Sequence, residues 1–162
     1  MMADMESDPA YHIRPARPGE AGAIRGLVRR AYAMYVPRMG KEPGPMLDDY
    51  EKRVADGTAV VLEVEGTIAG ILVLLPYDDH LLMDNVAVDT GFQGRGIGKA
   101  LVTFAEEEAV RRDYDEIHLY THQTMVENVR MYAKLGYEET GRGEQAGYDR
   151  VFMRKVLRRN TG

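Results

Sequence analysis

Residues 80–98 read HLLMDNVAVDTGFQGRGIG, and this stretch decides the fold. Its first half is mostly apolar and ends in Val-Ala-Val, a pattern typical of a strand that is buried on both faces. Its second half holds four glycines within residues 91–98. From Ile97 onward the apolar side chains fall on roughly one helical face, and the run closes on Arg111 and Arg112, which suit a helix C-terminus. The stretch therefore predicts a strand, a glycine-rich turn and a helix.

The turn before this helix predicts a site for a phosphate or pyrophosphate. The first N–H groups of a helix lack intrahelical partners, and the helix dipole places partial positive charge there. Glycines let a phosphate approach the backbone without meeting a Cβ atom. The spacing of Gly94, Gly96 and Gly98 does not match the dinucleotide fingerprint, and Gln93 and Ala100 break the mononucleotide loop motif. A glycine-rich turn that binds nothing is the alternative interpretation.

Length and composition indicate one globular domain. The chain has 162 residues, of which 44% are apolar and 29% are charged. We expect a domain over residues 11–157, a disordered segment over 1–10 and a frayed tail over 158–162. No apolar run is long enough to predict a membrane span.

Charge and residue types narrow the functional classes. The net charge of −5 argues against a general nucleic-acid binder and is compatible with a cationic acceptor such as an amine. Without cysteine there is no disulfide, thiolate zinc site or cysteine nucleophile. The four histidines lack the spacing of a helical metal motif, so we expect no metal. We expect a cytoplasmic protein, either a monomer or a homodimer.

The rest of the chain alternates strand and helix patterns. We expect strands at 11–15, 58–64, 67–75, 80–88, 116–120, 137–141 and 149–156. We expect helices at 18–35, 46–55, 97–112 and 125–135, and loops at 37–45 and 142–147. Strands 80–88 and 116–120 should be parallel, because a helix connects them, whereas the other neighbours should form hairpins. The prediction is an α+β fold with a mixed, mostly antiparallel sheet of about seven strands and helices on both faces.

Two motifs resemble one known family. Val86-Ala87-Val88, followed five residues later by QGRGIG at 93–98, resembles the acyl-CoA signature of the GCN5-related N-acetyltransferases, roughly [QR]-x-x-G-x-[GA]. Residues 127–137, ENVRMYAKLGY, are similar to a later helix of that family, which often ends in Y-x-K-L-G-F/Y. The order of elements over about residues 11–156 is similar as well. The resemblance implies the GNAT-like fold and transfer of an acetyl group from acetyl-CoA to a primary amine of a small molecule or a protein. A non-catalytic acyl-CoA sensor of the same fold is the alternative.

The resemblance also implies how the coenzyme binds. In the family the loop amides hold the CoA pyrophosphate, and the preceding strand hydrogen-bonds the pantetheine arm. Many members carry an asparagine where this chain has Met125, and the nearest asparagine here is Asn128. The implied coenzyme-binding residues are Val86, Ala87, Val88, Gln93, Gly94, Arg95, Gly96, Ile97, Gly98, Lys99 and Asn128.

Three residues are candidates for the chemistry. The resemblance implies that Tyr132 lies near the CoA sulfur and protonates the leaving thiolate. A phenol with a pKa of about 10 suits this task, since the thiolate is released from a thiol with a pKa of about 8–9. Two residues compete for the role of general base. Asp84 lies on the central strand, where strict alternation would place it on the face of Val86 and Val88. His122, at the end of the next strand, has a natural pKa that suits a base.

The acceptor pocket is the least patterned part of the sequence. We expect it to form from the segments 36–46, 76–80 and 142–148. The candidate lining residues are Tyr32, Tyr35, Arg38, Tyr77 and Tyr148.

Overall fold

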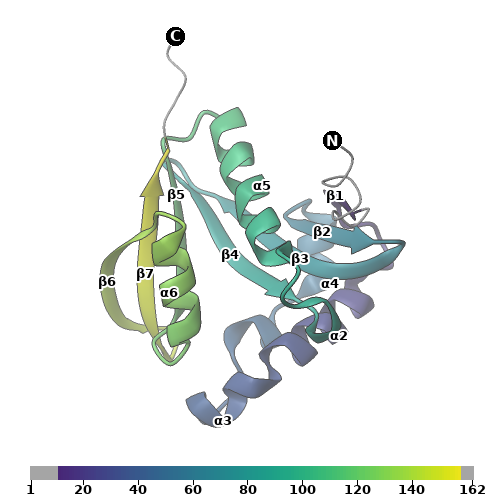
Figure 1. Ribbon diagram of the computed structural model, residues 1–162, viewed down its shortest axis with the longest axis horizontal. Helices are drawn as coiled ribbons and strands as arrows, with labels where there is room; N and C mark the ends of the chain where they lie inside the picture. The colour runs from purple at the N-terminus through teal and green to yellow at the C-terminus, as the bar shows by residue number, and fades with distance from the viewer. Residues whose placement is uncertain (1–10, 158–162) are drawn as a thin grey trace.

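The computed structural model describes residues 11–157 and contains one seven-stranded sheet in the order β1-β2-β3-β4-β5-β7-β6 (Figure 1). All neighbouring strands are antiparallel except β4 and β5, which are parallel. This confirms the predicted α+β fold. The segments 1–10 and 158–162, expected to be disordered and frayed, lie outside the described residues. The strands are β1 Tyr11–Pro15, β2 Ala59–Val64, β3 Thr67–Pro76, β4 Leu81–Val88, β5 Glu116–His122, β6 Glu138–Gln145 and β7 Tyr148–Val156.

Helices lie on both faces of the sheet, and the central strand β3 is apolar on both sides. The helices are α2 Ala21–Tyr32, α3 Val36–Met39, α4 Tyr50–Ala55, α5 Ile97–Arg111 and α6 Val126–Lys134, with 3-10 turns η1 Ala33–Tyr35, η2 Gly44–Leu47 and η3 Thr90–Phe92. In β3, Leu72 joins the core cluster that includes Leu101 of α5, whereas the next residue, Val73, joins the cluster that includes Leu27 of α2. Among the helices of residues 11–157, none is long and apolar enough to cross a membrane.

Two predicted loops differ from the observed structure. The segment 37–45 contains the end of α3 and the start of η2, and the following helix begins only at Tyr50, where the Asp49 side chain caps it. The expected loop at 142–147 is wrong, because β6 continues to Gln145 and β7 starts at Tyr148. The two residues between them, Ala146 and Gly147, both have positive φ angles, 55° and 85°. Such a two-residue turn closes a tight hairpin, so the glycines of this segment mark a strand and its turn.

The central strands β4 and β5 separate along their length. Their pairing within the described chain is limited to Leu81–Met83 against Ile117–Leu119, so the following residues of both strands face an opening. A register shift between β3 and β4 falls at Asp84, which is left out of the pairing between Met83 and Asn85. Such a bulge redirects side chains near functional sites. This opening is where the candidate site lies.

The bulge overturns the expected face of Asp84. Val86 and Val88 pack against the core cluster that contains α5, whereas Asp84 forms an ion pair with Arg53 of α4, on the opposite side. Strict alternation failed here because the extra residue at the bulge shifts the strand by one position.

Candidate functional site

The turn between β4 and α5 presents a row of free backbone donors. Gly94 and Gly96 have φ angles of 81° and 79°, a conformation that glycine adopts without strain. The successive N–H groups from Gln93 to Lys99 donate no hydrogen bond to any residue between 11 and 157. The Gln93 side chain ties the turn to the strand by donating to the Val88 carbonyl at 3.3 Å. Free amides at the start of a helix of 15 residues form a site for an anion.

A groove, which we call the loop groove, runs from this turn along the end of β4 to α6. Its open space is about 960 Å³. It brings together nearly all of the residues predicted to bind a coenzyme. Arg95 is the exception, because its guanidinium lies over the Phe92 ring at 5.1 Å and is exposed. The groove is lined by Ala31, Tyr32, Tyr35, Val86, Ala87, Val88, Phe92, Gln93, Gly94, Gly96, Ile97, Gly98, Lys99, Asn128, Met131 and Tyr132.

A second cavity, which we call the inner pocket, continues from the loop groove between the separated strands. It has about 570 Å³ of open space, including the solvent at its mouth. Its walls are Met83–Val86 of β4 and Leu119–His122 of β5, and Pro43–Pro45 contribute from the segment before α4. The cavities share four lining residues, so they lie next to each other. The shared residues are Tyr32, Val86, Asn128 and Tyr132.

Only some of the residues that were expected to line the acceptor pocket line the inner pocket. Tyr32 and Tyr148 line the inner pocket, whereas Tyr35 lines only the loop groove. Arg38 instead joins α3 to α6 through two hydrogen bonds of 2.8 Å to the Glu127 carboxylate. Tyr77 lies outside both cavities, where it stacks on His80 at 5.0 Å. Tyr77 and His80 line a third hollow instead, which shares Asp84, Leu119, Tyr120 and Arg150 with the inner pocket.

Tyr132 lies where the two cavities meet. It projects from α6, its side chain is 7% exposed, and its hydroxyl has no hydrogen-bond partner in the described part of the chain. Burial raises the pKa of Tyr132, which keeps the phenol protonated at neutral pH. One turn earlier on the helix, Asn128 also reaches both cavities, while Met125 is buried. The coenzyme contact of Asn128 stays a prediction.

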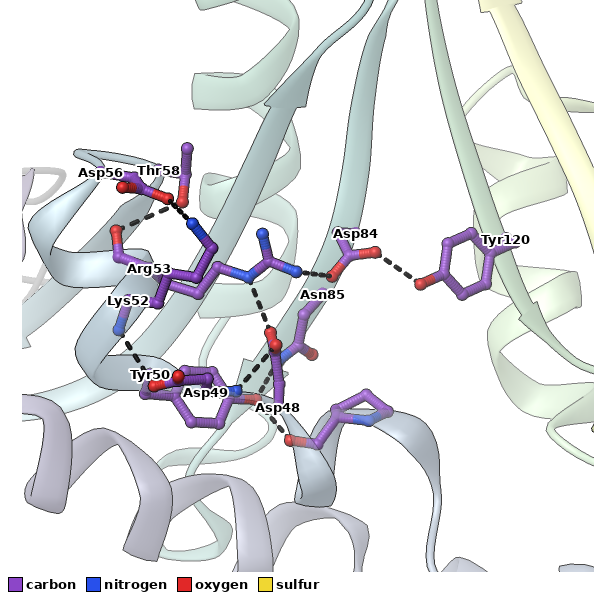
Figure 2. A network of polar contacts seen from close by, with 11 residues as sticks. Asp48, Asp49, Tyr50, Lys52, Arg53, Asp56, Thr58, Asp84, Asn85 and Tyr120 are labelled. Atoms are coloured by element: carbon purple, nitrogen blue, oxygen red, sulfur yellow. Dashed lines mark hydrogen bonds and ion pairs between the residues drawn. The ribbon is translucent and has the colours of Figure 1, made fainter. Parts of the chain in front are cut away.

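Asp84 links the inner pocket to α4. Figure 2 shows its carboxylate between Tyr120 and Arg53. The Tyr120 hydroxyl donates to it at 2.5 Å, and the nearest Arg53 nitrogen is 4.0 Å away. Arg53 also pairs with Asp48 at 2.9 Å. Burial, followed by the nearby Asp84 charge, raises the pKa of the Tyr120 phenol. Asp84 thus lines the pocket and also fixes the position of the Tyr120 ring.

A buried chain of hydrogen bonds connects the loop groove to the wall of the inner pocket. This chain was not predicted from the sequence. The Tyr32 hydroxyl donates to Asn85 Oδ1 at 2.7 Å, and Asn85 Nδ2 donates to the Tyr50 hydroxyl at 3.0 Å. Tyr50 in turn donates to the Pro45 carbonyl at 2.6 Å (Figure 2). Asn85 is 4% exposed and Tyr50 is fully buried. The sequence feature that could have revealed this chain is an asparagine within an apolar strand, because a buried side-chain amide needs hydrogen-bond partners.

The contacts of His122 determine which of its two ring nitrogens carries the hydrogen. Its Nδ1 accepts a hydrogen bond from the Thr124 backbone N–H at 3.1 Å, so the neutral ring carries its hydrogen on Nε2. Burial lowers the pKa of His122; Asp149 opposes this shift, whereas Lys41 and Arg150 add to it. The ring is therefore neutral at pH 7, and its available nitrogen does not accept a proton.

Between residues 11 and 157, no group of three or more histidine, aspartate or glutamate side chains is placed to hold a metal ion. The site consists of an amide-lined turn, a groove and a connected pocket. This arrangement is typical of proteins that bind an anionic ligand beside a second ligand.

Comparison with known proteins identifies the family. Residues 25–137 match the model of the Acetyltransferase (GNAT) family, and the chain belongs to this family. It is 23% identical over 140 residues to the spore coat polysaccharide biosynthesis protein SpsD of Bacillus subtilis (strain 168), covering 82% of this chain and 48% of that protein. The chain spans 38% to 56% of the length of the curated relatives it matches.

Solved structures share the fold. The PaiA N-acetyltransferase of Thermoplasma acidophilum, in complex with coenzyme A, superimposes with a TM-score of 0.76 at 15% identity, covering 91% of this chain and 99% of that one. YncA of Salmonella typhimurium, with its cofactor acetyl-CoA, superimposes with a TM-score of 0.71 at 19% identity, covering 94% and 96%.

Proposed function

We propose that this chain transfers an acetyl group from acetyl-CoA to a primary amine by direct attack of the amine on the thioester. The observation that carries the proposal is the row of free N–H groups from Gln93 to Lys99, at the mouth of a groove that leads to Tyr132. Membership of the acetyltransferase family supports the reaction, and the coenzymes bound by two proteins of similar fold support the donor.

In this proposal the loop groove holds the coenzyme. The amides of the turn bind the pyrophosphate, and Lys99 adds positive charge beside it. The edge of β4 beyond Met83 is free of β5, so its backbone groups can pair with the pantetheine arm. The thioester then lies at the junction of the two cavities, close to Tyr132.

The amine enters from the inner pocket. Its nitrogen forms a bond to the carbonyl carbon of the acetyl group, and the carbon–sulfur bond breaks. Tyr132 gives a proton to the departing thiolate, since its buried phenol is protonated and faces the junction. Asp84 accepts the proton of the amine. We assign the base to Asp84 because the Thr124 amide already occupies the acceptor nitrogen of His122. Most of the rate comes from holding the two reactants together.

The test combines binding with turnover. Calorimetry should show binding of CoA, and free thiol should appear when acetyl-CoA is mixed with a panel of amines. Asp84→Asn should lower kcat about 10²-fold. Asp48→Asn is the matched control, because Asp48 also pairs with Arg53 but does not line the inner pocket.

Three results would redirect the proposal. Absence of CoA binding would remove its basis. Binding without thiol release with any amine would identify a non-catalytic acyl-CoA sensor instead. An unchanged kcat for Asp84→Asn would leave the reaction intact but exclude Asp84 as the base.

A further inference from the structure

The wall of the inner pocket contains an arginine with an unusual set of neighbours. The guanidinium carbon of Arg150 in β7 lies 3.9 Å from the centre of the Tyr120 ring and 5.7 Å from that of Tyr148. Its Nη1 donates to Gln145 Oε1 at 2.6 Å. Two aromatic faces and one amide therefore hold the guanidinium at the pocket wall.

Arg150 differs from the other arginines because it is partly buried and has no carboxylate partner. Four other arginines in the described chain are buried or half-buried, and each pairs with a carboxylate: Arg14, Arg25, Arg53 and Arg154. No ion pair joins Arg150 to any residue between 11 and 157. A partly desolvated guanidinium in a pocket, with N–H groups that are still free to donate, is suited to bind a planar anion through two parallel hydrogen bonds.

The groups around Arg150 reinforce its preference for an anion. Lys41 donates to the Gly147 carbonyl, and its ammonium lies 4.1 Å from the centre of the Tyr148 ring. His122 meets the same ring edge-on at 6.3 Å, with Nε2 as the nitrogen that carries hydrogen. The acidic groups nearby are Asp149, which is exposed, and Asp84, which is bound by Tyr120.

We propose that the acceptor is an amine that also carries a carboxylate, and that Arg150 binds this carboxylate. The proposal rests on the proposed acetyl transfer. The amine then lies beside Asp84 and Tyr132, and the carboxylate lies against Arg150, which rests on the ring of Tyr120 next to Asp84. Asp84 contributes by locking the Tyr120 hydroxyl, which sets the ring on which Arg150 rests. The substrate class is an amino acid, free or at the terminus of a short peptide.

The experiment compares matched acceptors. Initial rates of thiol release from acetyl-CoA are measured for a panel of L-amino acids, for their carboxamides and for dipeptides with an acidic second residue. We expect wild type to prefer one or more carboxylated acceptors over the matched amides by about 100-fold in kcat/KM. The dipeptide arm separates a free amino acid from a peptide terminus as the source of the carboxylate.

Variants assign the preference to Arg150. Arg150→Gln should lower kcat/KM for the carboxylated acceptor about 100-fold and leave the value for its amide unchanged. Arg150→Lys should retain part of the activity, because charge remains but the planar fork is lost. Arg130→Gln is the control, because Arg130 is exposed on α6 and lines neither cavity.

The outcomes distinguish this proposal from the proposed function. Equal rates for acids and amides, or an equal loss for both in Arg150→Gln, would overturn the carboxylate site while acetyl transfer stands. No thiol release with any amine would instead refute the transfer. In that case, calorimetry of amino-acid binding to the CoA-saturated protein tests whether Arg150 binds the carboxylate. Binding that disappears in Arg150→Gln supports it, and no binding refutes it.

Discussion

The loop groove and the inner pocket meet at Tyr132, yet they are built from different parts of the polypeptide. The anion-binding end of the groove consists of backbone N–H groups from one short segment, Gln93 to Lys99. The inner pocket consists of side chains from α2, α3, β4, β5, α6, β7 and the segment before α4. A site built from the local backbone has a pattern that can be read in sequence. A site built from distant side chains has no such pattern.

This difference predicts that the two regions can be damaged separately. Changes in the glycine turn should affect coenzyme binding for every acceptor. Changes in the pocket should affect the reaction or the acceptor and leave coenzyme binding intact. Four measurements test this separation.

Gly94→Asp should have the largest effect. A carboxylate placed a few Å from the coenzyme phosphates costs roughly 4 kcal/mol, which raises the Kd for CoA about 10³-fold. Calorimetry measures the Kd. Gly143→Asp is the control, because Gly143 is exposed on β6 and has open space around it. Similar Kd values for the two variants would contradict an anion site at the turn.

Tyr132→Phe should lower kcat about 10²-fold, because the departing thiolate loses its proton donor. The hydroxyl makes no hydrogen bond within the described chain, so its removal should barely change the free energy of unfolding. Steady-state kinetics and CoA calorimetry check the two parts. A lower affinity for CoA with unchanged kcat would indicate that the hydroxyl only binds the coenzyme.

Tyr50→Phe should affect the pocket alone and more modestly. It removes the donor to the Pro45 carbonyl and the acceptor for Asn85, a loss of about 1–3 kcal/mol of stability. Loosening Pro45 should raise KM for the acceptor while the Kd for CoA is maintained. Tyr114→Phe is the control, because its exposed hydroxyl also donates to a backbone carbonyl, that of Tyr77. Urea unfolding gives the loss of stability, and steady-state kinetics give KM for the acceptor. An equal loss of stability in the two variants would refute the contribution of the buried hydrogen bonds.

The smallest effect concerns an ion pair remote from both cavities. Hydrogen bonds from Arg14 lower the pKa of Glu20 to about 2 in the folded protein, so the stabilisation is present above the unfolded value of about 4.3 and is lost as the pH falls toward 2. Because Glu20 is 22% exposed, we expect Glu20→Gln to cost about 1–2 kcal/mol at pH 7 and progressively less below pH 4.5.

Unfolding curves between pH 7 and pH 3 measure this difference for Glu20→Gln. CoA binding at pH 7 should stay the same in this variant. A stability difference that does not shrink in acid would show that the carboxylate charge is not the cause.

The glycine turn and the strand order could be predicted because their signals are local. Glu65-Gly66 also marked its hairpin correctly, with φ angles of 51° and 83°. Asp84 was located on the right strand but on the wrong face, because a bulge depends on how β3 and β4 pair. Arg150 was missed because its importance comes from Tyr120 and Tyr148, which only the folded chain places beside it.

The sequence by itself determined the family, the strand–turn–helix unit and the part of the loop groove that this unit lines, because backbone conformation near glycines follows from neighbouring residues. Only the tertiary structure decided that β4 and β5 separate after Met83, that His122 is locked as a donor, and that one arginine stands unpaired at the pocket wall. Those features arise from contacts between segments far apart in the chain. Such contacts depend on packing and register, which no short pattern of residues encodes.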